Sequence, residues 1–348
     1  MKIPKYIKPG DTIGVVAPSF GATTEPYIYR FQEAIKKFKD RGYNVVIGEC
    51  CYKSDGLGIS TLPEIAAAEL MKFYLDDKID VVLSCGGGEL MCETISHLDF
   101  KKLESATPKW FMGYSDNTNF IFPLATMCDV ASIYGPNAPG FGKPWEQPEY
   151  DAIELLEGKK NTVIGYKEFQ NPEVESKDPL SPYIYTDPKV LVSYVSNDRT
   201  GKLIKATSND KIEFSGVLIG GCLDVLVCLS GTKFDNIKKF NEKYKDVIWF
   251  LESCDYNPMD IRRGLWHLRE SGWFDNAKGF LIGRPYSAFR QEIMGVNQYN
   301  GVIDILKEFN VPIILDCDIG HIDPAMPLIV GSYATVLVKD NNIEISMK

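Results

Sequence analysis

Short apolar runs alternate with longer stretches of mixed apolar and polar residues along the first part of the chain. The apolar runs read TIGVVAPS, YNVVIGE, DVVLSCGGG, WFMGYS and SIYGPN, and the mixed stretches cover residues 27–41, 62–76, 89–97 and 117–128. Runs of this length are typical of buried strands, and the mixed stretches have the spacing of amphipathic helices. The alternation predicts a doubly wound α/β sandwich with a largely parallel sheet. We expect this N-terminal α/β domain over residues 1–165.

Residues able to do chemistry follow several of these predicted strands. They are Ser19, the run Gly86 to Gly88, Ser115 and the segment Gly135-Pro136-Asn137. Ligands of doubly wound sheets bind where the carboxyl ends of the strands meet loops. We therefore expect a ligand site at this edge of the N-terminal sheet.

The periodicity fades between residues 166 and 205, which contain Pro172, Pro179, Pro182 and Pro188. These prolines exclude a long helix or a central strand. Structureless stretches of this length in compact proteins are usually functional or disordered, and we expect an interdomain connection that also serves as a site loop.

Apolar runs resume over residues 206–348, where we expect a C-terminal α/β domain. They read FSGVLIGGCLDVLVCLSGT, DVIWFLES, AKGFLIGR and VPIILDCDIG. Between them we expect a helix from Pro258, which suits the first helical position, through Gly272, and another near residues 299–309. The chain ends in a predicted hairpin that turns at Asn341-Asn342.

Charge and composition narrow the class of ligand. The 348 residues carry a formal net charge of −9. Nucleic acids and anionic membranes bind proteins through clustered Lys and Arg, so we expect neither as a partner and a small molecule or peptide instead. The first residues lack the continuous apolar segment of a signal peptide, and no run is long enough to span a membrane. The expected location is the cytoplasm.

Ser115 lies in WFMGYSDNTNF, and two interpretations of this serine are open. Ser and Asp are common helix N-caps, because their side chains accept hydrogen bonds from backbone N–H groups. A serine on a sharp turn between a strand and a helix is also the arrangement of a catalytic nucleophile. The G-x-S-x-G pattern is only half met, because Asn117 occupies the place of the second glycine.

A serine nucleophile needs a base, and the chain has only three histidines. His97 falls near the end of a predicted helix, and His267 falls inside an amphipathic one, so both favour structural roles. His321 follows the strand IILDC in a loop, where functional side chains concentrate. The alternative is a loop histidine hydrogen-bonded locally.

The nine cysteines form no C-x-x-C pair, and no histidine has a second ligand at zinc spacing, so we expect reduced thiols and no metal site.

An acid must orient the histidine, and Glu252 ends the apolar run VIWFL. A carboxylate there is costly to bury unless it is paired. A structural ion pair with Arg262 or Arg263 is the alternative, and Asp255 is a competing acid.

The glycine run SCGGGEL lacks the spacing of a dinucleotide fingerprint. It reads either as a tight turn or as open backbone N–H groups for an oxyanion.

Together these segments resemble a known family. GVVAPS, CGGG, GYSDNT, GP, LIGG, FLES, GFLIGR and GHIDPAMPLIVGS occur in the order, and at nearly the spacing, of the LD-carboxypeptidase family of serine peptidases. The resemblance spans almost the whole chain, and its most specific elements are GYSD and the G-H-x-x-P-x-x-P-x-x-x-G pattern. The chain length and the segments GGCLDVL and FLESCD are most similar to the microcin C immunity branch, whose members act on a peptidyl-nucleotide antibiotic.

The resemblance implies a site and a fold. The positions that match a Ser-Glu-His triad are Ser115, Glu252 and His321, and the N–H groups of Asp116 and Gly87 match the oxyanion hole. It implies an N-terminal α/β sandwich that carries the nucleophile and a C-terminal, partly barrel-like domain that carries Glu and His. It also implies a site between the domains, a homodimer, and no metal or organic cofactor.

Two departures from the family pattern concern substrate binding. Cys222 stands where the family commonly has an asparagine in G-G-N-L, so a weakly polar thiol replaces an amide. Immunity enzymes are also expected to stack a nucleobase on a tryptophan, yet no tryptophan lies between Trp145 and Trp249. Tyr183 or Tyr185 could substitute with a smaller ring.

We therefore expect a serine peptidase that cleaves an amide near a carboxyl terminus. One candidate substrate is a microcin-like aminoacyl nucleotide, whose hydrolysis gives immunity. The other is murein tetrapeptide, from which a muropeptide LD-carboxypeptidase removes terminal D-alanine. A catalytically silent two-domain binding protein and a nucleotide-dependent enzyme that uses the glycine run are the alternatives from other classes.

Overall fold

The computed structural model describes residues 1–174, 176–197, 202–207 and 210–348. Contacts within the chain divide it into two compact units. Unit 1 comprises Met1–Lys160, residues 176–182 and Pro327–Gly331, and unit 2 comprises Asn161–Val174, Tyr183–Met326 and Ser332–Lys348. None of the helices within these described ranges combines the length and the apolar character needed to cross a lipid bilayer.

Unit 1 is built on a mainly parallel sheet with the strand order β17-β5-β4-β3-β1-β2. Its strands are β1 (Thr12–Val16), β2 (Asn44–Ile47), β3 (Val81–Ser84), β4 (Trp110–Gly113), β5 (Ser132–Tyr134) and β17 (Leu328–Val330). Strands β1 to β5 are parallel to their neighbours, and β17 pairs antiparallel with β5. Central strands β3 and β4 are buried throughout, as expected for a sheet covered on both faces. The prediction of a doubly wound α/β domain is confirmed.

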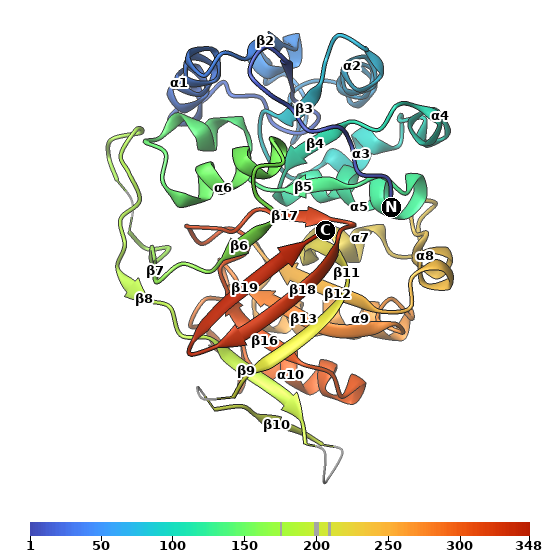
Figure 1. The fold of residues 1–348 in the computed structure, drawn as a ribbon, viewed down its shortest axis with the longest axis vertical. Coiled ribbons are helices and arrows are strands. Elements are labelled where there is room, and N and C mark those ends of the chain that lie inside the picture. Colours follow the sequence, from blue (N-terminus) through green and yellow to red (C-terminus); the bar gives the residue numbers. More distant parts are fainter. Residues whose placement is uncertain (175, 198–201, 208–209) are drawn as a thin grey trace. The chain divides into compact units, whose positions relative to one another are not determined.

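Helices connect the strands of this sheet (Figure 1). They are α1 (Tyr27–Asp40), α2 (Pro63–Leu75), α3 (Met91–Ile95), α4 (Phe100–Ser105), α5 (Thr118–Cys128) and α6 (Gln147–Leu156), with 3₁₀ turns η1 (Glu49–Tyr52), η2 (Ser115–Asn117) and η3 (Ala138–Gly142). Helix α1 shows why the chain folds this way, because it buries Phe31, Ala34, Ile35 and Phe38 at helical spacing. The loops that follow β1, β3, β4 and β5 all lie at one edge of the sheet.

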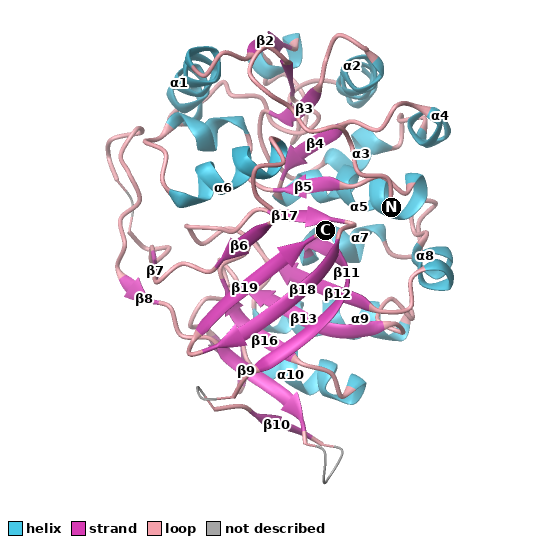
Figure 2. Cartoon of the chain, in the orientation of Figure 1, coloured by secondary structure: helices cyan, strands magenta, loops and turns pink. Residues whose placement is uncertain are grey.

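Unit 2 is built on a mixed sheet with the strand order β10-β9-β16-β13-β12-β11-β18-β19-β6. Its strands are β6 (Thr162–Ile164), β9 (Val192–Ser196), β10 (Leu203–Lys205), β11 (Ile212–Cys222), β12 (Val247–Glu252), β13 (Ala277–Gly283), β16 (Ile313–Cys317), β18 (Tyr333–Lys339) and β19 (Asn342–Met347). The middle strands β11, β12, β13 and β16 are parallel, and antiparallel strands flank them (Figure 2). Within the described residues the edge strands β10 and β6 do not pair, so the sheet is open rather than a closed barrel.

Helices and short ladders complete unit 2. The helices are α7 (Leu223–Leu229), α8 (Ile237–Lys243), α9 (Pro258–Glu270) and α10 (Asn300–Leu306), followed by the 3₁₀ turn η4 (Lys307–Phe309). The ladders pair β7 (Glu168–Phe169) with β8 (Asp187–Pro188), and β14 (Glu292–Ile293) with β15 (Val296–Asn297). Pro258 occupies the first position of α9, as predicted, and the Asn257 side chain caps that helix.

Two details differ from what the sequence suggested. In the stretch expected as a connection, β9 pairs with both β16 and β10, so this part belongs to the sheet of unit 2; residues 175 and 198–201 of the stretch lie outside the described residues. The terminal hairpin turns one residue earlier than predicted. Lys339 pairs with Asn342, and Asp340 and Asn341 have φ of 51° and 57°. Positive φ at both central residues is what a tight two-residue hairpin turn requires, and Asp and Asn tolerate it.

Candidate active site

The loops at the carboxyl edge of the unit 1 sheet are joined by a network of hydrogen bonds. Asn117 donates from Nδ2 to the carbonyl of Gly86 at 2.9 Å and to Oδ1 of Asn137 at 3.2 Å. The N–H of Phe20 donates to the carbonyl of Gly87 at 2.9 Å. The segments after β1, β3, β4 and β5 therefore meet, as their positions in the sequence predicted.

Ser115 stands at the centre of this edge in a strained backbone conformation. Its φ is 64°, which is rare for a residue with a side chain. Tyr114 precedes η2 as its cap, Asn117 precedes α5, and neither cap position makes a side-chain capping bond. The Ser115 N–H donates to the Tyr134 hydroxyl at 3.0 Å. Ser115 therefore occupies the N-cap position of neither η2 nor α5.

Of the three glycines after β3, Gly87 is the one that contacts Ser115. A Cβ on Gly87 would lie 3.1 Å from the Cβ and 3.3 Å from the Oγ of Ser115. The same test at Gly86 meets Phe20, and at Gly88 it meets the Ser19 hydroxyl and Phe20. A side chain at position 87 would therefore crowd the serine hydroxyl, and only glycine leaves the backbone beside it accessible.

Asp116 ties the serine turn to its neighbours through a buried side chain that is 2% exposed. Its carboxylate accepts hydrogen bonds from the Ser19 hydroxyl at 2.5 Å, the Met91 N–H at 2.9 Å and the Asn119 amide at 2.8 Å. Burial raises the pKa of Asp116, and these three hydrogen bonds oppose that shift. The sequence reasoning used only the backbone N–H of Asp116 and missed this anchor; an aspartate directly after the serine was the available signal.

Unit 2 holds a histidine paired with a buried carboxylate. Nδ1 of His321 lies 2.7 Å from Oε2 of Glu252, across a sequence separation of 69 residues. The Glu252 side chain is fully buried at the end of β12, and the His321 side chain is 13% exposed. A local hydrogen bond for His321 was the alternative prediction, and the structure replaces it with a long-range one.

The neighbours of this pair fit closely and favour a charged ring. A Cβ on Gly320, whose φ is 103°, would collide with the Glu252 side chain, so the backbone packs directly on the carboxylate. Burial lowers the pKa of His321, but the charge of Glu252 and hydrogen bonds with Glu252 and Cys254 outweigh it, and the pKa lies well above the usual value for histidine. Cys254 was not singled out from the sequence.

The competing residues are placed elsewhere. Asp255 is exposed. Arg262 pairs with Asp304 and Arg263 with Asp260, so the proposed structural pair with Glu252 is not formed. His97 is exposed just after α3, and His267 lies in the last turn of α9.

Cys222 is buried beside Glu252 rather than exposed to a ligand. It pairs in register with Glu252, is 2% exposed, and its thiol donates to Oδ2 of Asp224 at 3.4 Å. Burial raises the pKa of Cys222 well above its usual value, so the thiol stays protonated. Asp224 also accepts the N–H groups of Asp255 and Tyr256 at 2.9 and 3.0 Å, which holds the loop after Glu252. Sequence reasoning missed Asp224, which the helix start after GGC could have suggested.

Tyr183 and Tyr185 form an aromatic pair in unit 2. Their ring centroids lie 6.2 Å apart at an interplanar angle of 47°. Tyr185 is 40% exposed, and the backbone between the rings is fixed by the Ile184 N–H, which donates to Oε1 of Gln170 at 3.1 Å. The pair offers an apolar ring surface on a fixed loop.

Comparison with known proteins gives matches along most of the chain. The family model of the LD-carboxypeptidase N-terminal domain matches residues 13–135, and that of the LD-carboxypeptidase C-terminal domain matches residues 215–336. The microcin C7 self-immunity protein MccF of Escherichia coli is 25% identical over 345 residues, covering 97% of this chain and 93% of the relative. The probable murein peptide carboxypeptidase of Bacillus subtilis is 24% identical, covering 96% and 91%. A structure of MccF in complex with aspartyl sulfamoyl adenosine superposes with a TM-score of 0.79 at 20% identity, covering 100% and 99% of the two chains.

Proposed function

The chain belongs to the LD-carboxypeptidase family, and from that premise we propose that it is a serine peptidase of the microcin C immunity type. In this proposal Ser115 is the nucleophile, His321 the general base and Glu252 the acid that orients it. The substrate is a small peptide or aminoacyl nucleotide with an amide near its carboxyl terminus.

The proposed reaction divides the work between these residues. His321 takes the hydroxyl proton of Ser115 as the oxygen attacks the carbonyl carbon, and the N–H groups of Gly87 and Asp116 stabilise the oxyanion. The imidazolium then gives its proton to the leaving amine, and the acyl-enzyme forms. His321 then takes a proton from water as the water attacks this ester, and returns it to the Ser115 oxygen as the carboxylate product leaves. Glu252 accepts the hydrogen bond from Nδ1–H throughout and stabilises the charged ring.

The pairing of His321 with Glu252 at 2.7 Å is the observation that carries the proposal. A buried carboxylate that fixes one nitrogen of a partly exposed imidazole sets the tautomer that a general base needs. The strained conformation of Ser115 supports it, because strained residues cluster at active sites and Ser115 occupies the N-cap position of neither η2 nor α5.

The Tyr183–Tyr185 pair favours a substrate with an aromatic group. Stacking on an aromatic side chain stabilises a nucleobase by about 1–3 kcal/mol. The structure of MccF with aspartyl sulfamoyl adenosine shows that a protein of this fold binds such a compound. We therefore place an aminoacyl nucleotide first among the substrates.

Removal of terminal D-alanine from murein tetrapeptide is the second candidate. The similarity to a probable murein peptide carboxypeptidase over 96% of this chain favours it. Cys222 affects how either substrate is bound. Its thiol already donates to Asp224, so it offers a substrate fewer hydrogen bonds than the amide of an asparagine would.

Incubation of the protein with each substrate, followed by mass spectrometry, tests the proposal. The substrates are processed microcin C and murein tetrapeptide, and the control is Ser115→Ala. We expect the amide of processed microcin C to be hydrolysed by the native protein and to stay intact with the variant. Faster release of D-alanine than cleavage of the nucleotide would select the second candidate, and no hydrolysis of either compound would favour a binding protein.

A further inference from the structure

The segment that leads to His321, residues 316–320, is held by a buried arginine that the proposed reaction does not use. Arg284 directly follows β13 and is 2% exposed. Its Nη1 donates to the carbonyl of Asp316 at 2.8 Å, and its Nη2 donates to Oδ1 of Asp318 at 2.5 Å. The guanidinium also packs over the ring of Phe169 at 4.3 Å from the centroid. One rigid side chain therefore fixes both a carbonyl and a carboxylate of this segment.

Asp318 spreads this attachment to the surrounding chain. Its second carboxylate oxygen accepts the N–H of Tyr166 at 2.8 Å and lies 3.8 Å from Nζ of Lys189. Its carbonyl accepts the N–H of Met326 at 2.7 Å, which closes the loop that contains His321. Because Asp318 is fully buried, its charge depends on these partners.

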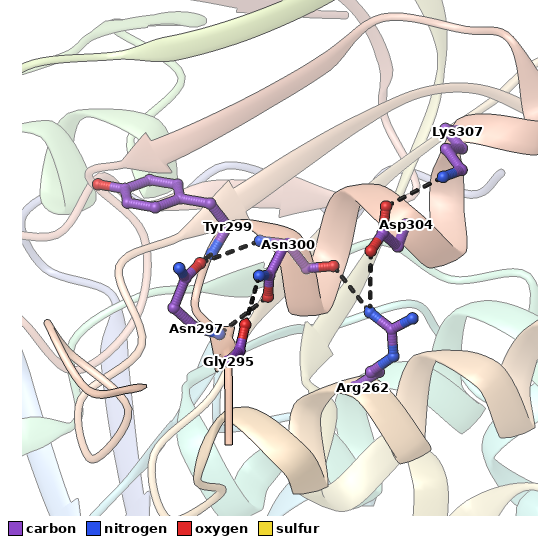
Figure 3. Close-up of polar contacts among 7 residues, drawn as sticks. All are labelled: Arg262, Gly295, Asn297, Tyr299, Asn300, Asp304 and Lys307. Carbon is purple, nitrogen blue, oxygen red and sulfur yellow. Dashed lines mark hydrogen bonds and ion pairs between the residues drawn. The ribbon is translucent and has the colours of Figure 1, made fainter. Parts of the chain in front are cut away.

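A second group of residues holds the same segment at Asp316. The Tyr299 hydroxyl and the Gln298 amide donate to its two carboxylate oxygens at 2.8 and 3.0 Å. Figure 3 shows how the turn before α10 is fixed: Asn297 accepts the N–H groups of Tyr299 and Asn300, and Arg262 of α9 donates to the Asn300 carbonyl. Tyr299 therefore contacts Asp316 from a braced turn.

The backbone of the segment needs such support. Asp316 has a φ of 59° and Gly320 a φ of 103°, so two left-handed residues flank the approach to His321. The pairing of β13 with β16 also shifts register between Leu281 and Gly283. A left-handed conformation at a residue other than glycine persists only where its surroundings hold it.

We propose that Arg284 is a positioning residue, which holds residues 316–320 in the conformation that brings His321 to Glu252. This inference rests on the proposed function for its kinetic consequence, but not for its structural one. Lysine cannot replace Arg284, because an ammonium is a point charge and does not present two parallel N–H groups to a carbonyl and a carboxylate.

Other ionisable groups around these residues set the background for any test. Around Arg284 these groups are Asp316, Asp318, Cys317, Lys189 and Arg290. His321 is faced by Glu252 and Cys254. Glu252 in turn lies near Asp224 and Cys222. A substitution at Arg284 removes none of the groups that face His321. A change in the pKa of His321 then reports that the ring has moved relative to them.

Nuclear magnetic resonance of the histidine rings tests the proposal without any substrate. The chain has three histidines, so the His321 signals are assigned by their loss in His321→Ala. In Arg284→Lys we expect the pKa of His321 to fall toward its usual value and the Nδ1–H signal to weaken, because the ring moves away from Glu252. The matched control is Arg263→Lys, which alters an exposed arginine paired with Asp260 and should leave both signals unchanged. Asp318→Asn is a second variant with the same expectation, should Arg284→Lys fail to fold.

Kinetics give a second reading on the same variants. We expect kcat to fall about 10- to 100-fold with KM little changed, because misplacement of a catalytic group by about 1 Å has this cost. Folded variants whose His321 signals match those of the control would overturn the inference, whatever their melting temperature. A native protein that hydrolyses no substrate would instead refute the proposed function, and the ring signals would still decide the role of Arg284.

Discussion

The two halves of the proposed site are built by different means. In unit 1 the backbone makes the geometry. Ser115 is held at a φ of 64°, and Gly87 leaves room beside it because it has no side chain. In unit 2 side chains make it, since Glu252 and His321 meet across 69 residues of sequence. Backbone conformation therefore shapes the turn of the proposed nucleophile, whereas a pair of side chains makes the proposed base. Substitutions in the two halves should fail in different ways.

Loss of the base is the largest effect that we expect. His321→Ala should lower kcat by about 10³- to 10⁶-fold, because triad members act as a unit. Glu252→Gln should lower it by about 10²- to 10⁴-fold, since the amide cannot stabilise the imidazolium and favours the wrong tautomer. Steady-state kinetics on the preferred substrate measure both.

Asp255→Asn is the matched control for the acid, because Asp255 is exposed and lies three residues from Glu252. We expect near-native kcat for this variant. If Asp255→Asn abolished activity while Glu252→Gln kept it, the acid would be misassigned. The Glu252–His321 pair would then not be the unit 2 half of the site.

The aromatic pair tests whether unit 2 also recognises the substrate. Tyr183→Ala and Tyr185→Ala, singly and together, should reduce kcat/KM on an aminoacyl nucleotide by about tenfold or more, because a lost aromatic platform costs about 1–3 kcal/mol. The effect on murein tetrapeptide should be small, since a peptide offers little flat surface. Equal, small effects on both substrates would contradict the preference for a nucleotide.

The pH dependence of kcat/KM reports on the unit 2 half alone, because it follows the titration of His321. Serine attack needs a neutral imidazole, so kcat/KM should fall as pH drops through the pKa of His321, and this limb should lie above pH 6.5. In Glu252→Gln the limb should move to lower pH. Because the folded pKa is raised, the pair stabilises the fold fully below the ordinary histidine pKa and loses this contribution as pH rises through the folded value. A limb at or below the ordinary histidine pKa in the native protein would contradict the coupling of Glu252 to His321.

The smallest effect concerns the backbone of the nucleophile turn. Ser115→Gly and Ser115→Ala both remove the hydroxyl, but only glycine adopts a positive φ without steric cost. Ser115→Gly should therefore be more stable than Ser115→Ala by about 1 kcal/mol in denaturant unfolding. Equal stabilities would mean that the turn is not strained, and the contrast between the halves would weaken.

Much of unit 1 follows from its sequence, and the reason is physical. Buried parallel strands need continuous apolar runs, so β1, β3, β4 and β5 stand out, and with them the residues at their ends. Strand β17 was not predicted, because it is only three residues long and comes from a distant part of the chain. The terminal hairpin was predicted, but its turn was misplaced by one residue.

The support around the base was beyond local sequence patterns. Arg284 ends the run GFLIGR and Asp318 lies in ILDCDIG, yet no periodicity links residues 34 positions apart. An arginine directly after the apolar run GFLIG was the signal that a buried partner existed. The Glu252–His321 pair was anticipated by elimination among three histidines and by family resemblance, rather than by spacing.

Labelling with a fluorophosphonate probe tests the central claim most directly. The probe reacts with serines that an adjacent base activates, and peptide mass spectrometry locates the adduct. The account predicts one adduct, on Ser115, which is absent in Ser115→Ala and forms much more slowly in His321→Ala. An unlabelled native protein, an adduct on another residue, or labelling of His321→Ala at the native rate would contradict it.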